Sequence, residues 1–293
     1  MVATAQRTEE GAFDQFAGAE YDAHLYEHHG FADGIDGFGA FAAAADAHVA
    51  RYQEQGFLVI HDLLSPAEVQ ASLEGLLDLI DGQRPGFRHV QFEAQSRPLL
   101  AALPREQKQD LVRKIFNFVE YEPRLKAIAE HPQILEIARR LIGEAPALFE
   151  NKALLKPPLI GREKPWHQDH AYWNLPLDAR VVTVWIALDP ATTENGCLYV
   201  IPGSHREGPV VHFRRRDWQI CDTGVATARV AAAPLAPGGC LFFDSMLHHG
   251  TPANASPQRR RALQFVYVPA SAVRITQAER LAVFGSEGKD VTC

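Results

Sequence analysis

The chain of 293 residues carries 29 lysines and arginines against 36 aspartates and glutamates, a formal net charge of −7. Hydrophobic residues make up 46% and charged residues 22% of the chain, which is the balance of a globular enzyme and excludes a mainly disordered or fibrous protein. An acidic chain has no general basic footprint for nucleic acid or anionic lipid. We therefore expect no nucleic-acid partner. Because no run of about 18 apolar residues is present, we also expect no membrane partner.

The four cysteines are widely scattered and form no CxxC pair, so the sequence indicates neither a disulfide framework nor a zinc ribbon. The chain begins MVATAQRTEE, with acidic residues where a signal peptide has a basic start and an apolar run. We therefore expect a cytoplasmic protein.

The first fifty residues are rich in Ala, Gly, Phe and His, and we interpret residues 1–50 as an N-terminal extension or lid. Residues 51–293 are expected to form a single domain. Phe57 to Ile60 is a short apolar run typical of a strand. Ser65-Pro66-Ala67-Glu68 then combines an N-cap, a proline and a capping glutamate, and predicts a helix that ends at Asp81-Gly82.

Residues 105–142 have a mostly helical pattern that is broken at Pro123 and Pro132 and stopped by Gly143. We expect residues 65–142 to be a helical support. Short segments rich in Val, Thr and aromatic residues then alternate with turn residues, and these predicted strands are 147–156, 181–189, 197–201, 239–243 and 261–268. Helices followed by many short strands predict a mainly β fold with flanking helices, a jelly-roll core over 147–270.

The sharpest chemical signal is Trp166-His167-Gln168-Asp169-His170. In an extended segment, His167 and Asp169 point to the same face because side chains alternate with period two. An imidazole and a carboxylate together supply two ligands of a 2-His-1-carboxylate iron site.

A second histidine is offered where the apolar run Phe242-Phe243 leads to His248-His249-Gly250. The next predicted strand begins with three arginines, at 259, 260 and 261. Arginine grips a planar carboxylate with two parallel hydrogen bonds, so an anionic co-substrate is expected to bind here.

The HQD and HHG segments and the trailing arginine resemble the phytanoyl-CoA dioxygenase family of Fe(II)/2-oxoglutarate oxygenases, over roughly residues 50–270. The resemblance implies a double-stranded β-helix of the jelly-roll and cupin type. It implies that the iron ligands are His167, Asp169 and His249, and that the 2-oxoglutarate arginine, eleven positions after the last histidine, is Arg260.

The same resemblance implies further contacts with 2-oxoglutarate. Trp185 stands eighteen positions after the first histidine, and Thr251 stands two after the last. Lys152 and Lys114 match family positions near the co-substrate. The side chains expected to line the substrate pocket, because they lie in or follow the HxD motif, are Gln168, His170, Tyr172, Trp173 and Asn174.

Such a site implies hydroxylation of an unactivated C–H bond in a small molecule, with O2 consumed and 2-oxoglutarate converted to succinate and CO2. Halogenation is disfavoured because related halogenating enzymes have Ala or Gly in place of Asp169. Two alternatives stay open: a cupin-type metalloenzyme that does not use 2-oxoglutarate, and a non-catalytic jelly-roll binding module. The sequence leaves the substrate open and is compatible with a monomer or a homodimer.

Overall fold

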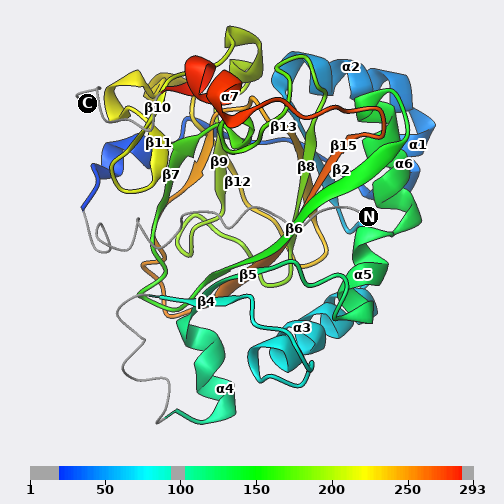
Figure 1. The fold of residues 1–293 in the computed structure, drawn as a ribbon, viewed down its shortest axis with the longest axis vertical. Helices are drawn as coiled ribbons and strands as arrows, with labels where there is room; N and C mark the ends of the chain where they lie inside the picture. The colour runs from blue at the N-terminus through cyan, green and yellow to red at the C-terminus, as the bar shows by residue number, and fades with distance from the viewer. Residues whose placement is uncertain (1–19, 94–102, 286–293) are drawn as a thin grey trace.

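The structure is a computed structural model that describes residues 20–93 and 103–285. Two main β-sheets face each other, and most of the helices gather on one side of the molecule, over the outer face of the larger sheet (Figure 1). None of the helices in the described ranges has the length and apolar character that a membrane span requires.

The larger sheet has eight strands in the described residues. Its order is β2 (Gly34–Asp36), β3 (Phe57–His61), β13 (Cys240–Asp244), β8 (Val182–Ala187), β15 (Arg260–Pro269), β6 (Pro146–Lys156), β5 (Val112–Phe116) and β4 (Val90–Phe92). The smaller sheet has five, in the order β1 (Gly30–Phe31), β12 (Ala231–Ala233), β9 (Leu198–Val200), β14 (His249–Thr251) and β7 (Lys164–His167). A separate hairpin joins β10 (His212–Arg214) and β11 (Trp218–Ile220).

The side chains of the large sheet alternate between two cores, as the period of a strand requires. Leu263 and Phe265 point outward, into the core that the sheet shares with the helices, whereas Trp185, Ala262 and Leu241 point inward, between the two sheets. This is the predicted jelly-roll core, a double-stranded β-helix with flanking helices. The inner face of the large sheet is therefore where a site between the sheets has to be built.

The seven α-helices of the described residues are α1 (Gly37–Ala43), α2 (Ala45–Gln55), α3 (Pro66–Ile80), α4 (Arg105–Lys108), α5 (Pro123–Ala129), α6 (Pro132–Ile142) and α7 (Gln277–Phe284). The predicted start of α3 is confirmed: the Ser65 side chain accepts the Glu68 N–H, and the Glu68 side chain bonds back to the Ser65 N–H. The predicted breaks at Pro123 and Pro132 are confirmed as the first residues of α5 and α6.

The prediction of helix over 105–142 is wrong at β5. The predicted helical support 65–142 is wrong at both β4 and β5. Val112 and Ile115 are both buried, and their spacing fits a helix as well as an irregular strand. The sequence pattern therefore predicted a helix where the structure has a strand. Residues 112–116 instead form β5, in which residues 114–116 pair with β6, with Ile115 opposite Ala153. Pairing with a distant strand overrides local propensity here.

The described part of the region 1–50 packs directly onto the two sheets. Strand β1 pairs with β12 and β2 pairs with β3, both in parallel. The indole N–H of Trp166 donates to the Leu25 carbonyl at 3.0 Å, and the Tyr26 hydroxyl donates to Glu163 at 2.8 Å. Residues 20–36 therefore cover the strand that carries the HxD motif, and residues 1–19 lie outside the described ranges.

Replacing Gly238 by Ala should lower the free energy of unfolding by about 2 kcal/mol or more. Gly238 precedes β13 with φ +88°, and an added Cβ would lie 2.5 Å from the Leu64 carbonyl oxygen. The matched control is Gly30→Ala, because nothing lies within 4 Å of a Cβ added there. Urea denaturation should show a change of no more than about 0.5 kcal/mol for the control, and equal losses in the two variants would contradict this account.

Candidate metal centre

The pairing of β7 with β14 brings two distant histidines together. His167 is the last residue of β7, His249 is the first of β14, and the antiparallel register sets them directly opposite each other. Their ring centres are 4.1 Å apart. Gly250 permits this approach, since a Cβ there would lie 3.2 Å from the Trp166 nitrogen and from the Lys164 carbonyl oxygen.

Asp169 completes the cluster. It begins the short 3-10 helix η6 (Asp169–Tyr172), which turns the chain immediately after β7. Its Oδ1 lies 3.4 Å from His167 Nε2 and 3.7 Å from His249 Nε2, and the three donor atoms lie within 4.8 Å of one another. All three side chains are buried. The structure thus brings the three predicted ligands to one point between the sheets.

Hydrogen bonds orient each ligand. His167 Nδ1 lies 2.8 Å from the Pro165 carbonyl oxygen, and His249 Nδ1 lies 2.9 Å from that of Leu247. Each carbonyl accepts the Nδ1 proton, which leaves the Nε2 lone pair directed at the cluster. These contacts fix the tautomer that a metal ligand needs.

The carboxylate is oriented by two residues that the sequence analysis missed. Asp169 Oδ2 accepts from the Thr183 hydroxyl at 3.0 Å and from the Gln264 side-chain amide at 3.4 Å. The other oxygen, Oδ1, is the one that faces the imidazoles. Thr183 lies two residues before Trp185, so strand alternation is the signal that could have placed it on the same inner face.

The protonation states suit a divalent transition metal. Burial lowers the pKa of His167 to about 3 and also lowers the pKa of His249, so both imidazoles are neutral near pH 7. Burial raises the pKa of Asp169, but the two imidazoles outweigh it and hold that pKa well below its usual range. Two neutral imidazoles and one carboxylate are the donor set of a non-haem Fe(II) site.

Arg260 is a buried cation on the same inner face. Its Nη1 donates to the Leu154 carbonyl at 3.0 Å and its guanidinium carbon lies 5.3 Å from the centre of the Trp185 ring. Its Nε is buried without a hydrogen-bond partner in the described part of the chain, and so is the hydroxyl oxygen of Thr251. Burial lowers the pKa of Arg260 to about 10.

The neighbouring arginines are different. Arg259 bonds to Asp110 at 2.9 Å and Arg261 to Asp189 at 2.7 Å. Leaving a buried donor without a partner is costly, so the unsatisfied Nε of Arg260 and the unsatisfied hydroxyl of Thr251 are candidates to bind an anion. The carboxylate of 2-oxoglutarate fits this requirement.

Lys156, opposite Arg260 on β6, is not available to such an anion. Its fully buried ammonium donates to the main-chain carbonyl oxygens of Arg162 and Pro252. Lys156 therefore ties the loop before β7 to the loop after β14.

The remaining residues expected near the co-substrate lie on the same wall of the barrel. Trp185 and Lys152 both stand opposite Gln264, and Lys114 stands opposite Leu154. The Lys152 ammonium lies 2.9 Å from Glu150. The Lys114 ammonium lies 5.7 Å from the centre of the Phe116 ring.

Two of the residues expected to line the substrate pocket have structural partners. The Gln168 amide donates to the Gly208 and Met246 carbonyls and accepts the Val210 N–H. The His170 ring lies between the Ser245 hydroxyl at 2.9 Å and the Leu175 carbonyl at 3.2 Å. Both side chains are fully buried and hold neighbouring loops together.

The other three expected pocket residues are Tyr172, Trp173 and Asn174, and of these Tyr172 and Trp173 also have hydrogen-bond partners. The Tyr172 ring packs edge-on against His167, with 5.7 Å between ring centres. The Trp173 indole donates to Glu150 at 3.1 Å. The side-chain oxygen of Asn174 is buried and has no partner among the described residues.

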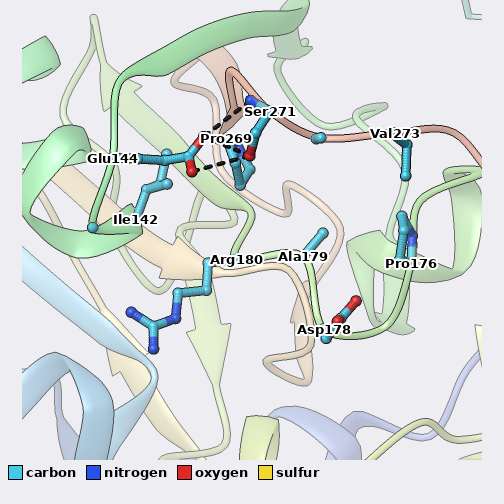
Figure 2. A pocket seen from close by; sticks show the side chains of 11 residues that line it. Ile142, Glu144, Pro176, Asp178, Ala179, Arg180, Pro269, Ser271 and Val273 are labelled. Atoms are coloured by element: carbon cyan, nitrogen blue, oxygen red, sulfur yellow. Dashed lines mark hydrogen bonds between the residues drawn. The ribbon is translucent and has the colours of Figure 1, made fainter.

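A surface hollow of about 410 Å³ lies away from this cluster (Figure 2). It is lined by the end of α6 and by the loops around residues 176–180 and 269–273, and Ser271 donates to the Glu144 carboxylate across it. None of the triad residues contributes to its lining.

A double-stranded β-helix that holds a buried His-x-Asp and a distant His between its sheets defines the non-haem iron oxygenases. The sequence profile of the phytanoyl-CoA dioxygenase (PhyH) family matches residues 52–262. The chain belongs to this family, and it is a non-haem Fe(II)/2-oxoglutarate-dependent dioxygenase with a His-x-Asp…His facial triad.

Individual relatives agree with this assignment. The chain is 26% identical over 260 residues to phytanoyl-CoA dioxygenase domain-containing protein 1 of Danio rerio, covering 75% of this chain and 88% of that one. It is 27% identical over 263 residues to an ectoine dioxygenase of Bordetella bronchiseptica, covering 80% and 78%. The fold matches EctD from S. alaskensis, solved with 2-oxoglutarate and 5-hydroxyectoine, with a TM-score of 0.66 and 22% identity over 92% of this chain and 90% of that one.

Thr183→Val should weaken Mn(II) binding, used as a redox-inert substitute for Fe(II), by about 10- to 100-fold. The substitution keeps the shape of the side chain but removes the hydroxyl that holds Asp169 Oδ2. Isothermal titration calorimetry measures the effect, and Thr193→Val in the loop between β8 and β9 serves as the control. A Thr183→Val protein with wild-type affinity would show that this hydrogen bond does not orient the ligand.

Metal affinity should also stay nearly constant as the pH falls from about 7 to about 5. An imidazole whose pKa is lowered to about 3, as for His167, remains neutral over this range and protons do not compete with the metal. Repeating the Mn(II) titration across the range tests this. Histidines of ordinary pKa would instead lose affinity progressively below about pH 6.5.

Proposed function

We propose that this enzyme hydroxylates an unactivated C–H bond of a small molecule. The overall reaction would convert the substrate, 2-oxoglutarate and O2 to the hydroxylated product, succinate and CO2, with one oxygen atom entering the product and one entering succinate. The observation that carries the proposal is the buried triad of His167, Asp169 and His249, together with the buried Arg260, whose Nε has no hydrogen-bond partner among the described residues.

The donor set supports the assignment of metal and co-substrate roles. His167 Nε2, His249 Nε2 and Asp169 Oδ1 would hold the metal, and Arg260 and Thr251 would hold the remote carboxylate of 2-oxoglutarate against the Trp185 ring. When bound, Fe(II) and 2-oxoglutarate together activate O2 for attack on the C–H bond.

Three protein ligands support hydroxylation over halogenation. His167, Asp169 and His249 would hold the metal, and 2-oxoglutarate and O2 would bind to it at the positions that these side chains leave. Asp169 therefore leaves no position for a halide. The buried site also limits the access of water, which protects the oxidation from side reactions.

The relatives support a small-molecule substrate, since ectoine dioxygenases are named for a small solute. The unsatisfied Nε of the buried Arg260 argues against a cupin-type enzyme that does not use 2-oxoglutarate, because such an enzyme has no co-substrate carboxylate to accept from it. A non-catalytic binding module is excluded by the enzyme class of the family.

An anaerobic titration of the Fe(II) protein with 2-oxoglutarate should produce a visible metal-to-ligand charge-transfer band. Arg260→Met should raise the 2-oxoglutarate concentration needed for half of the band by about 10- to 100-fold, because one charge-assisted pair is lost. Arg259→Met is the matched control, since that side chain is held by Asp110.

If the wild-type protein binds Fe(II) but shows no charge-transfer band with 2-oxoglutarate, then 2-oxoglutarate is not its co-substrate. An unchanged half-saturation in Arg260→Met would move the carboxylate site to another residue.

A further inference from the structure

A second group of charged side chains adjoins the triad at Tyr172, the last residue of η6 (Asp169–Tyr172), whose ring packs on His167. Lys164 lies on β7, opposite Thr251, and its ammonium donates to the Tyr172 hydroxyl at 2.7 Å. The same ammonium lies 4.6 Å from the centre of the Tyr172 ring, and that ring packs on the His167 ring at 5.7 Å. A group bound at Lys164 would therefore lie one tyrosine ring away from a metal ligand.

The carboxylate that faces Lys164 is Asp217, in the turn between β10 and β11. Its Oδ2 lies 2.8 Å from the Lys164 ammonium and 3.7 Å from Arg113 Nη2. Asp217 Oδ1 accepts the Trp218 N–H at 2.7 Å. Two cations thus converge on one carboxylate oxygen.

The electrostatics agree with an excess of positive charge. Burial lowers the pKa of Lys164 to about 8; Asp217 opposes this shift, whereas Lys114 and Arg113 add to it. Burial raises the pKa of Asp217, but Lys164, Lys114 and Arg113 outweigh it and hold that pKa below its usual range.

The other carboxylates described nearby already have cations of their own. Glu163 is bonded to Arg216 at 2.7 Å, and Glu93 to Arg162 at 2.7 Å. The Lys164 side chain is 24% exposed and that of Arg113 is 13% exposed, so neither is completely closed off from solvent.

We propose that the substrate carries an oxyanion, a carboxylate or a phosphate, that binds to Lys164 and Arg113 beside Tyr172. This inference rests on the proposed function, since it names the class of molecule that the same site oxidises. The anion would fix one end of the substrate, and the C–H bond to be attacked would lie on the triad side of Tyr172. Charge-assisted contacts of this kind fix orientation as well as affinity.

Anion binding is measured by calorimetry on full-length protein saturated with Mn(II) and 2-oxoglutarate, so that the co-substrate site is already filled. Inorganic phosphate and acetate are the probes, and the tighter of the two identifies the oxyanion. Lys164→Met should weaken binding of that probe by about tenfold or more. Asp217→Asn should strengthen it, because the competing negative charge is lost while the shape of the side chain is kept.

If Lys164 and Asp217 had only a structural role, their substitutions would not change the affinity for the probe in opposite directions. Lys126→Met, an exposed lysine on α5, is the matched control and should bind the probe as the wild type does. If one of the two variants fails to fold, Arg113→Met provides a second test of weakening.

Absence of probe binding to the loaded wild type, or equal affinity in Lys164→Met, would overturn the proposal. It would also be overturned if Lys164→Met weakened 2-oxoglutarate instead of the probe, since Lys164 would then belong to the co-substrate site. Failure of the proposed function is seen separately, as a wild-type protein that does not bind 2-oxoglutarate in the presence of Mn(II).

Discussion

The register between β7 and β14 is the constraint on which the site depends. With His167 directly opposite His249, both imidazoles point into the space between the two sheets. A slip of one residue would turn one ring to the other face, because strand side chains alternate with period two. The pairing is made possible by Gly250, and an irregularity in the ladder after His249 places Thr251 opposite Lys164. The metal triad, the hydroxyl proposed to bind the co-substrate and the lysine proposed to bind the substrate thus depend on one short ladder.

Buried charged side chains with a structural role differ in their pairing from those that we propose to bind ligands. Arg162 with Glu93 and Arg261 with Asp189 are ion pairs that connect loops to the barrel, and Arg216 bonds to both Glu163 and Asp222. At the site the matching is incomplete: Arg260 keeps a free donor, and Asp217 faces more than one cation. Since unmatched charge is expensive to bury, these are the two positions at which we propose that ligands bind.

Elements with strong local signals could be predicted from the sequence. The capping box at Ser65 and the prolines at 123 and 132 define helix starts through contacts within a few residues. The strands β6, β8 and β15 were placed within one or two residues of their bounds, and β8, with the sequence VTVWIA, has the strongest local β signal of the three. The strand β5 was not, because its extended form is decided by its ladder with β6 and not by its own composition.

The sequence by itself determined which residue types were available and their spacing: a histidine and an aspartate two apart, a second histidine before a glycine, and an arginine eleven positions later. Only the tertiary structure decided how these side chains are used. Arg259, Arg260 and Arg261 are chemically identical, and the difference between them is that Asp110 and Asp189 lie beside the outer two. Likewise Thr183, Gln264 and Lys164 gain their roles from distant partners. Such contacts join strands that are remote in sequence, and no local pattern records them.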